Sequence, residues 1–219
     1  MEDERGDAVP DCATFARTLG TLKREGSNIL LVGTATGPHE TVCQQLLGAA
    51  REDARYRLFV TDADDHVAHE GGADPGIERV RTIDYSESGL ESRSESDGES
   101  GQPSLGTLGI EIVETIGEFD DSADGLAPSA LRVCVDSLVP LLQEHDAETV
   151  FRLLQLTTSR VDQACGMGHY HLPLGPDHDA VNLLEPMFDA VVTVRSRNGT
   201  DEQQWYLREA DTTTDWLEL

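Results

Sequence analysis

The stretch Ser27 to Cys43, SNILLVGTATGPHETVC, determines the predicted fold. Its first part, NILLVG (28–33), is continuously apolar, which is typical of a strand buried on both faces of a parallel sheet. A glycine-containing turn follows, and HETVCQQLLGAA (39–50) then places its apolar residues on one helical stripe. Strand, turn and helix in this order predict a β-loop-α unit.

Alternating strands and helices continue on both sides of this unit. A helix is expected before Gly26, and the Asn198-Gly199 pair is a strong hairpin turn sequence near the end of the chain. This alternation predicts an α/β sandwich with a mostly parallel central sheet and a C-terminal β-hairpin. Strands are expected at 28–33, 57–61, 77–85, 131–135, 168–172, 190–195 and 204–208, and the longer helices at 105–119 and 147–164.

Two strands should lie parallel in that sheet, NILLVG (28–33) and LRVCV (131–135). Their apolar residues and one from a later strand are expected to be buried in neighbouring strands. These residues are Leu30, Leu31, Val32, Val133, Val135 and Val192.

The whole chain, 1–219, is predicted to form a single domain, since 219 residues suit one sizeable core. An acidic N-terminal tail is expected at 1–10. The stretch 86–104, rich in Ser, Glu and Gly, has too few apolar residues to offset the entropy of ordering it. It is therefore predicted to be a disordered surface loop within the domain.

Acidic residues dominate the composition, with 42 Asp and Glu against 16 Lys and Arg, one of them a lysine, and a net charge of −26. Such a surface repels nucleic acid and anionic membranes, and its self-repulsion is screened at high salt. We therefore expect adaptation to molar salt, as in halophilic archaea, with an ordinary acidic protein as the alternative. The acidic N-terminus does not fit a signal peptide, and no apolar run approaches a membrane span, so a cytoplasmic protein is expected.

Four cysteines, Cys12, Cys43, Cys134 and Cys165, lie far apart and form no C-x-x-C pair. Neither a zinc ribbon nor a secreted disulfide framework is indicated by this spacing. They are expected to be reduced, mostly buried thiols.

The turn after the first strand occupies the place of a phosphate loop, whose motif is G-x-x-x-x-G-K-[ST]. Counted from Gly33, the second glycine is Pro38, the lysine is His39 and the magnesium-binding hydroxyl is Glu40. Pro38 has no N–H to donate, and Glu40 adds a negative charge where a polyphosphate would bind. Other registers place Gly37 or Thr41 near the required positions but supply no lysine.

The strand LRVCV is followed by Asp136, which has two interpretations. An aspartate at a buried strand end orders Mg²⁺ in phosphate-loop proteins. It could equally cap a following helix.

Three segments carry a family resemblance: RVCVDSLVPLLQEHDAETVFRLLQLTTSRV, GMGHYHLP and DHDAVNLLEPMFDAVVTVRS. Together with the final hairpin, they resemble the RecA/KaiC-type ATPase core over residues 11 to 210. The chain is especially similar to the shortened, degenerate versions that halophilic archaea carry as signal-transduction or transducer-like proteins. The resemblance implies a RecA-like three-layer sandwich.

The resemblance also implies roles for single residues. Asp136 would be the magnesium-ordering carboxylate, and Asp62 stands where active members carry a catalytic glutamate. Both this shorter acid and the missing lysine argue against hydrolysis. The vestigial nucleotide-binding set is Gly33, Thr34, Gly37, His39, Thr41, Asp136 and Asp62.

In the RecA arrangement the strand of 168–172 lies between the strands of 28–33 and 131–135, so its end would face the vacated phosphate pocket. His169 and His171 have strand spacing and should point to the same face. With His178 and Asp179 nearby in sequence, they are candidate metal ligands, although most such histidines are solvent-facing or hydrogen-bonded.

The leading hypothesis is a non-catalytic RecA/KaiC-like domain that acts in signal transduction or regulation through a protein partner or self-association. It predicts no enzymatic activity and no cofactor. The alternative is an ATP-binding protein or slow ATPase, with ATP and Mg²⁺, in which His39 or an arginine from a neighbouring subunit replaces the lysine. A third interpretation is an α/β domain that has lost every site.

Overall fold

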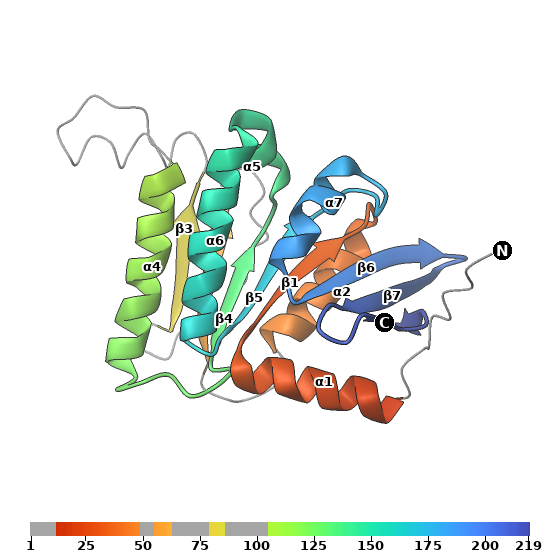
Figure 1. The fold of residues 1–219 in the computed structure, drawn as a ribbon, viewed down its shortest axis with the longest axis horizontal. Helices are drawn as coiled ribbons and strands as arrows, with labels where there is room; N and C mark the ends of the chain where they lie inside the picture. Colours follow the sequence, from red (N-terminus) through yellow and green to blue (C-terminus); the bar gives the residue numbers. More distant parts are fainter. Residues whose placement is uncertain (1–11, 49–54, 63–78, 86–104) are drawn as a thin grey trace.

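The computed structural model describes residues 12–48, 55–62, 79–85 and 105–219. The acidic tail expected at 1–10 and the loop expected at 86–104 lie outside the described residues. Within these residues the strands form a nine-stranded sheet in the order β3-β2-β4-β5-β1-β6-β7-β8, with β9 also paired to β7 (Figure 1).

The first six strands of this order are parallel, as the sequence predicts. At the C-terminus β7 pairs antiparallel with β6, and β8 and β9 each pair antiparallel with β7. The expected placement of the histidine strand between the NILLVG and LRVCV strands is confirmed, because β5 pairs with both β1 and β4. The strands are β1 (Ser27–Val32), β2 (Tyr56–Thr61), β3 (Val80–Asp84), β4 (Leu131–Val135), β5 (Met167–Leu172), β6 (Ala190–Arg197), β7 (Thr200–Leu207), β8 (Thr212–Thr213) and β9 (Leu217–Glu218).

Helices cover both faces of the sheet, which makes three layers (Figure 1). One face is covered mainly by two long helices that pack against each other, α4 and α6, and the other by α1 and α2. The helices are α1 (Cys12–Glu25), α2 (Thr36–Leu47), α4 (Leu105–Ser122), α5 (Val139–Glu144), α6 (Ala147–Gln163) and α7 (Asp179–Leu184), with a 3-10 turn, η2, at Glu185–Met187.

The core is divided by the sheet. Strand residues alternate between the two faces, so that Leu30 and Val32 pack on the α4/α6 side while Ile29 and Leu31 pack on the α1/α2 side. The six strand residues expected to be buried are all at most 4% exposed, which confirms the prediction. This alternation also sends polar residues of the central strands to opposite faces.

The C-terminal hairpin forms at the expected turn, but its strands are longer than the sequence predicts. β6 and β7 pair without interruption, from Ala190 opposite Leu207 to Arg197 opposite Thr200, which leaves a two-residue turn. Asn198 and Gly199 both have positive φ, 54° and 82°, as a tight hairpin turn requires. The polar residues on either side of this turn are therefore strand residues, because cross-strand pairing outweighs their low strand propensity.

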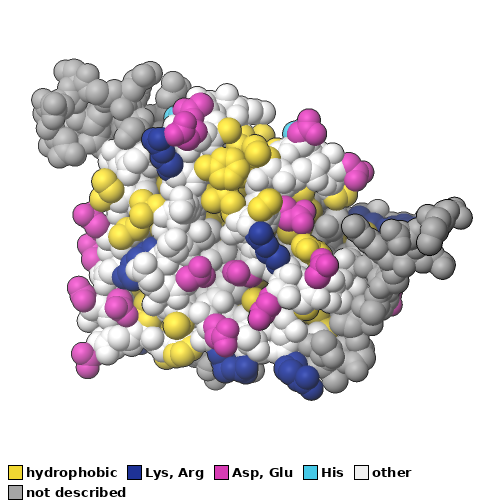
Figure 2. Space-filling view, viewed as in Figure 1, with side chains coloured by type: hydrophobic (Ala, Val, Ile, Leu, Met, Phe, Trp, Pro, Cys, Tyr) yellow, Lys and Arg dark blue, Asp and Glu magenta, His cyan; other side chains and the backbone are white. Residues whose placement is uncertain are grey.

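Acidic side chains are spread over the face shown in Figure 2, with Lys and Arg between them. On this face, charged side chains are thus spread out and not gathered in one patch. Among the described residues, no helix combines the length and apolarity needed to cross a membrane.

Candidate functional site

The turn after β1 is shorter than a phosphate loop. Only Gly33, Thr34 and Ala35 separate β1 from α2, whereas the phosphate-loop motif has four residues between its two glycines alone. Gly33 has φ +135° and donates its N–H to the Leu174 carbonyl at 2.9 Å. The first amide of the turn is therefore used within the protein.

The residue at the lysine position points into the protein. His39 is 7% exposed, and its Nε2 lies 2.7 Å from the Gly33 carbonyl oxygen. Pro38 is also buried in the first turn of α2, while Glu40 is exposed. The segment that would surround a phosphate is wound into helix instead, and its cation position faces the core.

The remaining residues of this segment that are expected to bind nucleotide are Thr34 in the turn and Gly37 and Thr41 in α2. Thr34 and Gly37 are exposed, and the Thr41 hydroxyl donates to the Gly37 carbonyl one helical turn earlier at 3.2 Å. This bond ties the Thr41 hydroxyl to the backbone of its own helix.

Two expected residues do come together, at the carboxyl ends of the strands. Asp62 after β2 and Asp136 after β4 line a pocket of about 350 Å³ with Tyr85, whose hydroxyl donates to the Ser137 carbonyl at 2.8 Å. Burial, followed by the charges of Asp62 and Asp136, raises the pKa of Tyr85 above its ordinary value. The pocket is completed by Ser137, Val139, Pro140, Pro173 and Leu174.

The alternative that Asp136 caps the next helix is wrong. α5 begins at Val139 without a capping side-chain bond from Leu138, and it is the Ser137 hydroxyl that accepts from the Val139 N–H, at 3.2 Å. Asp136 lies instead beside Cys134, with its Oδ1 3.7 Å from the thiol sulfur. Asp136 lies three residues before Val139, the first residue of α5, so Ser137 and not Asp136 lies next to the first amide of the helix.

Four buried side chains meet between α2 and the sheet. Cys43 comes from α2, Cys134 from β4, and His169 and His171 from β5, and their ligand atoms all lie within 4.8 Å of one another. The sulfur atoms are 3.8 Å apart, His169 Nε2 is 3.2 Å from the Cys43 sulfur, and His171 Nε2 is 3.8 Å from the Cys134 sulfur. We call these four residues the Cys/His cluster.

His39 connects the Cys/His cluster to the turn. Its Nδ1 lies 3.3 Å from His171 Nδ1, while its Nε2 contacts the Gly33 carbonyl, which can only accept a hydrogen bond. Burial, and then the neighbouring His171, lower the pKa of His39 to about 4. Neutral His39 therefore donates from Nε2 and accepts at Nδ1, so that His171 donates from Nδ1 and keeps a lone pair on Nε2.

The cluster lies in apolar surroundings. Leu47 and Phe59 pack beside its cysteines, and the four side chains are 8% exposed or less. Burial lowers the pKa of His169. A contact with the Cys43 thiol, together with burial, raises the pKa of Cys134. Burial thus favours the neutral forms of His169 and Cys134.

Of the four metal candidates from the sequence, the structure brings together His169 and His171. His178 is exposed and accepts from the Ala180 N–H at the start of α7, and Asp179 is exposed beside it. Cys43 and Cys134 were missed, because their spacing of 91 residues contains no metal-binding pattern. The available indication was that each lies on the inward side of its own element, Cys43 on the apolar stripe of its helix and Cys134 within a buried strand.

The other face of the sheet carries a different polar cluster, with residues from β1 and β5. The Asn28 amide donates to Asp162 Oδ1 at 2.7 Å and to the Thr158 carbonyl at 3.2 Å, and its oxygen accepts from the Tyr170 hydroxyl at 2.9 Å. Asp189 accepts from the Asn28 N–H at 2.7 Å. Burial, reinforced by the negative charge of Asp189, raises the pKa of Asp162 to about 6.

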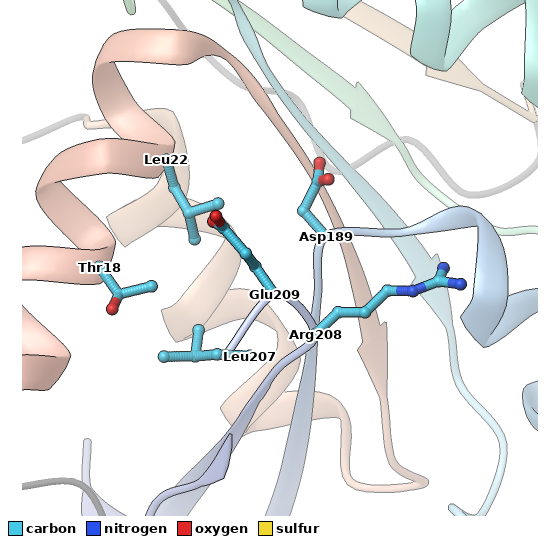
Figure 3. A pocket seen from close by; sticks show the side chains of 6 residues that line it. All are labelled: Thr18, Leu22, Asp189, Leu207, Arg208 and Glu209. Carbon is cyan, nitrogen blue, oxygen red and sulfur yellow. The ribbon is translucent and has the colours of Figure 1, made fainter. Parts of the chain in front are cut away.

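A second pocket, of about 320 Å³, lies beside Asp189, between α1 and the end of β7. Figure 3 shows Glu209 reaching toward Leu22 of α1, whereas Arg208 points the other way. The lining has two carboxylates, from Asp189 and Glu209, and one guanidinium, from Arg208. This excess of negative charge does not favour an anionic ligand. Thr18 and Leu207 complete its lining.

Comparisons with known proteins support the architecture. The model of a family of unknown function, DUF7504, matches residues 26–194. Among solved structures, a KaiC-like protein from the hyperthermophilic archaeon Pyrococcus horikoshii is similar with a TM-score of 0.52 and 14% identity, covering 89% of this chain and 82% of that chain. At this identity the likeness shows the fold alone, a KaiC-like RecA fold. The comparison with curated proteins gave no match.

Proposed function

The chain belongs to the family of unknown function DUF7504, and on this premise we propose that it is a non-catalytic RecA/KaiC-like domain that acts in signal transduction or regulation through protein contacts. One observation carries the proposal. In the three-residue turn after β1, Gly33 uses its own N–H and C=O within the protein, and the cation position is filled by the buried His39. A polyphosphate would find the first amide of the turn already bonded, no N–H at Pro38 and no lysine.

The surface supports a role in contacts. Ile110 on α4 and Leu156 on α6 are 56% and 42% exposed, and these helices pack against each other. Exposed aliphatic side chains on neighbouring helices suit a protein partner or a second copy of the chain. Light scattering in molar KCl should detect self-association, and a doubly substituted Ile110→Glu/Leu156→Glu chain should lose it. A chain that is monomeric at all concentrations would require a different protein as partner.

Calorimetry tests the absence of nucleotide handling. ATP with Mg²⁺ in molar KCl is expected to give no binding heat, and phosphate release is expected to equal the rate without protein. A dissociation constant in the micromolar range would overturn the proposal.

One observation favours ATP binding as the alternative. Asp62 and Asp136 face a common pocket at the carboxyl ends of the strands, where carboxylates can order Mg²⁺. In this alternative His39 or an arginine of a neighbouring subunit would take the place of the lysine. ATP binding that is measured for the native chain and lost in the Asp136→Ala variant would support this alternative.

We further propose that the protein works in the cytoplasm of a halophilic archaeon. The net charge of −26 supports this, because self-repulsion grows when the Debye length rises from about 3 Å in molar salt to about 10 Å at 0.1 M. The melting temperature should therefore fall as KCl is lowered over that range. A melting temperature that does not depend on salt would remove the reason for this assignment.

A further inference from the structure

We propose that Cys43, Cys134, His169 and His171 form a buried Zn²⁺ site that joins helix α2 to strands β4 and β5. The inference does not depend on the proposed function, since it concerns the interior behind the turn and not the strand ends where a nucleotide would bind. It is carried by donor chemistry, distances, burial and the orientation of one imidazole.

The distances match a tetrahedron. With Zn–S bonds of about 2.3 Å and Zn–N bonds of about 2.0 Å, the edges of a tetrahedral site are about 3.8 Å between two sulfurs and about 3.5 Å between sulfur and nitrogen. The sulfur atoms of Cys43 and Cys134 are 3.8 Å apart. The two sulfur–nitrogen contacts are 3.2 and 3.8 Å, and all four atoms lie within 4.8 Å of one another. Small side-chain shifts suffice to place all four around one ion.

The charge also balances. Two thiolates and two neutral imidazoles around Zn²⁺ give a neutral site, which can be buried among apolar side chains such as Leu47 and Phe59 without a counter-ion. Arg132 in β4 and Asp136 just after it flank Cys134 on the same face, and a guanidinium and a carboxylate carry opposite charges. The assembled site therefore leaves no excess charge in the core.

One ligand is already oriented for metal binding. His39 donates to the Gly33 carbonyl and accepts from His171 Nδ1, so the lone pair of His171 Nε2 faces the cluster. A hydrogen bond to the far nitrogen of an imidazole is the usual way in which proteins fix the tautomer of a metal-binding histidine. His39 is thus a positioning residue, and the turn after β1 supplies the acceptor that holds it.

The ligand set implies a structural role. Four protein ligands of the type Cys₂His₂ occupy every position of a tetrahedral ion and leave none for water or substrate. The ion would connect α2 to two central strands, β4 and β5, directly behind the closed turn. Metal binding would then stabilise the fold, because the unfolded chain does not hold these four residues together.

The test uses the full chain purified with its metal content left intact. Elemental analysis is expected to give one Zn²⁺ per chain. After removal of the metal, added Co²⁺ should give the intense visible spectrum of a tetrahedral ion, with thiolate-to-metal charge transfer in the near ultraviolet. Because this measurement needs no variant, it decides the proposal even if substituted chains fail to fold. An octahedral Co²⁺ spectrum, no uptake of either metal, or a Cys43–Cys134 disulfide in freshly purified protein would overturn the site.

A matched pair of double variants locates the ion. Cys43→Ser/Cys134→Ser should lose metal uptake, whereas Cys12→Ser/Cys165→Ser removes the same number of thiols and should keep one ion per chain. His169→Gln should weaken uptake strongly, while His178→Asn, outside the cluster, should leave it unchanged. Equal metal content in both double variants would place the ion elsewhere and contradict the proposal.

Discussion

Strand β5 contributes to a buried polar cluster on each of its two faces. On the α6 side, Tyr170 joins Asn28 and Asp162, and the contacts of Asn28 are hydrogen bonds of 2.7 to 3.2 Å to oxygen atoms. On the α2 side, His169 and His171 meet two cysteines through sulfur contacts of 3.2 to 3.8 Å, which stabilise little by themselves.

The difference teaches how a buried polar group can be used. The Asn28 cluster is complete as a protein structure, because hydrogen bonds among its own residues compensate the loss of water. The Cys/His cluster brings together soft donors at the edge lengths of a metal site. Because side chains of β5 alternate between the two faces of the sheet, Tyr170 joins a self-contained hydrogen-bond network on one face and His169 and His171 join a set of metal-binding groups on the other.

The largest effect is expected from the turn that supports the α2-side cluster. A Cβ at Gly33 would lie 2.3 Å from the Val194 carbonyl oxygen, and the φ of +135° suits glycine alone. We expect Gly33→Ala to destabilise the protein by about 3–5 kcal/mol. Denaturant unfolding in molar KCl measures this. Gly175→Ala, where the added Cβ meets nothing within 4 Å, should be nearly neutral, and equal losses in the two variants would contradict the argument.

Removing the centre of the α6-side network should be the next largest effect. Asn28→Leu keeps the approximate volume but leaves the fully buried Tyr170 hydroxyl without its acceptor. The expected loss is about 2–4 kcal/mol in the free energy of unfolding. Metal affinity should stay at the wild-type value, because the variant acts on the opposite face. A large loss of metal binding in Asn28→Leu would show that the two clusters are not independent.

His39 should affect both stability and metal binding. His39→Ala leaves the Gly33 carbonyl and His171 Nδ1 without their partner, which should cost about 1–3 kcal/mol. It should also lower metal affinity by about 10- to 100-fold, since the tautomer of His171 is no longer fixed. Competition with a chromophoric chelator measures the affinity on folded protein. If His39→Ala and Asn28→Leu change it equally, His39 has no positioning role.

The smallest effect is a pH dependence on the α6 side. The pKa of Asp162 is raised from 3.8 to about 6, so the folded chain holds this proton more tightly than the unfolded chain. Its contribution to stability is complete below about pH 4 and is lost as pH rises through about 6. Because the residue is partly exposed, the effect should be modest. Asp162→Asn should flatten the pH profile of unfolding between pH 4 and 7 relative to wild type, and identical profiles would refute this assignment.

The sequence predicted the arrangement of the sheet but not all of its details. Continuous apolar runs identified the central strands, and the Asn198-Gly199 pair placed the hairpin turn. The lengths of β6 and β7 were underestimated, since cross-strand pairing extends them over polar residues. The interpretation of Asp136 as a helix cap, one of two that the sequence left open, is wrong because the helix begins three residues later and Ser137 accepts from its first amide.

The amino-acid sequence by itself determined the β-loop-α order, the parallel core, the acidic surface and the absence of a lysine in the turn, because each depends on local pattern or on composition. Tertiary structure alone decided that Cys43 and Cys134 meet His169 and His171. Cys43 is 91 residues from Cys134 and 126 residues from His169 in the sequence. They lie close together because β5 is between β1 and β4 in the sheet and α2 packs against β4 and β5. A pairing of strands distant along the chain leaves no periodic trace in the sequence, so chemistry that depends on it becomes visible only in the folded protein.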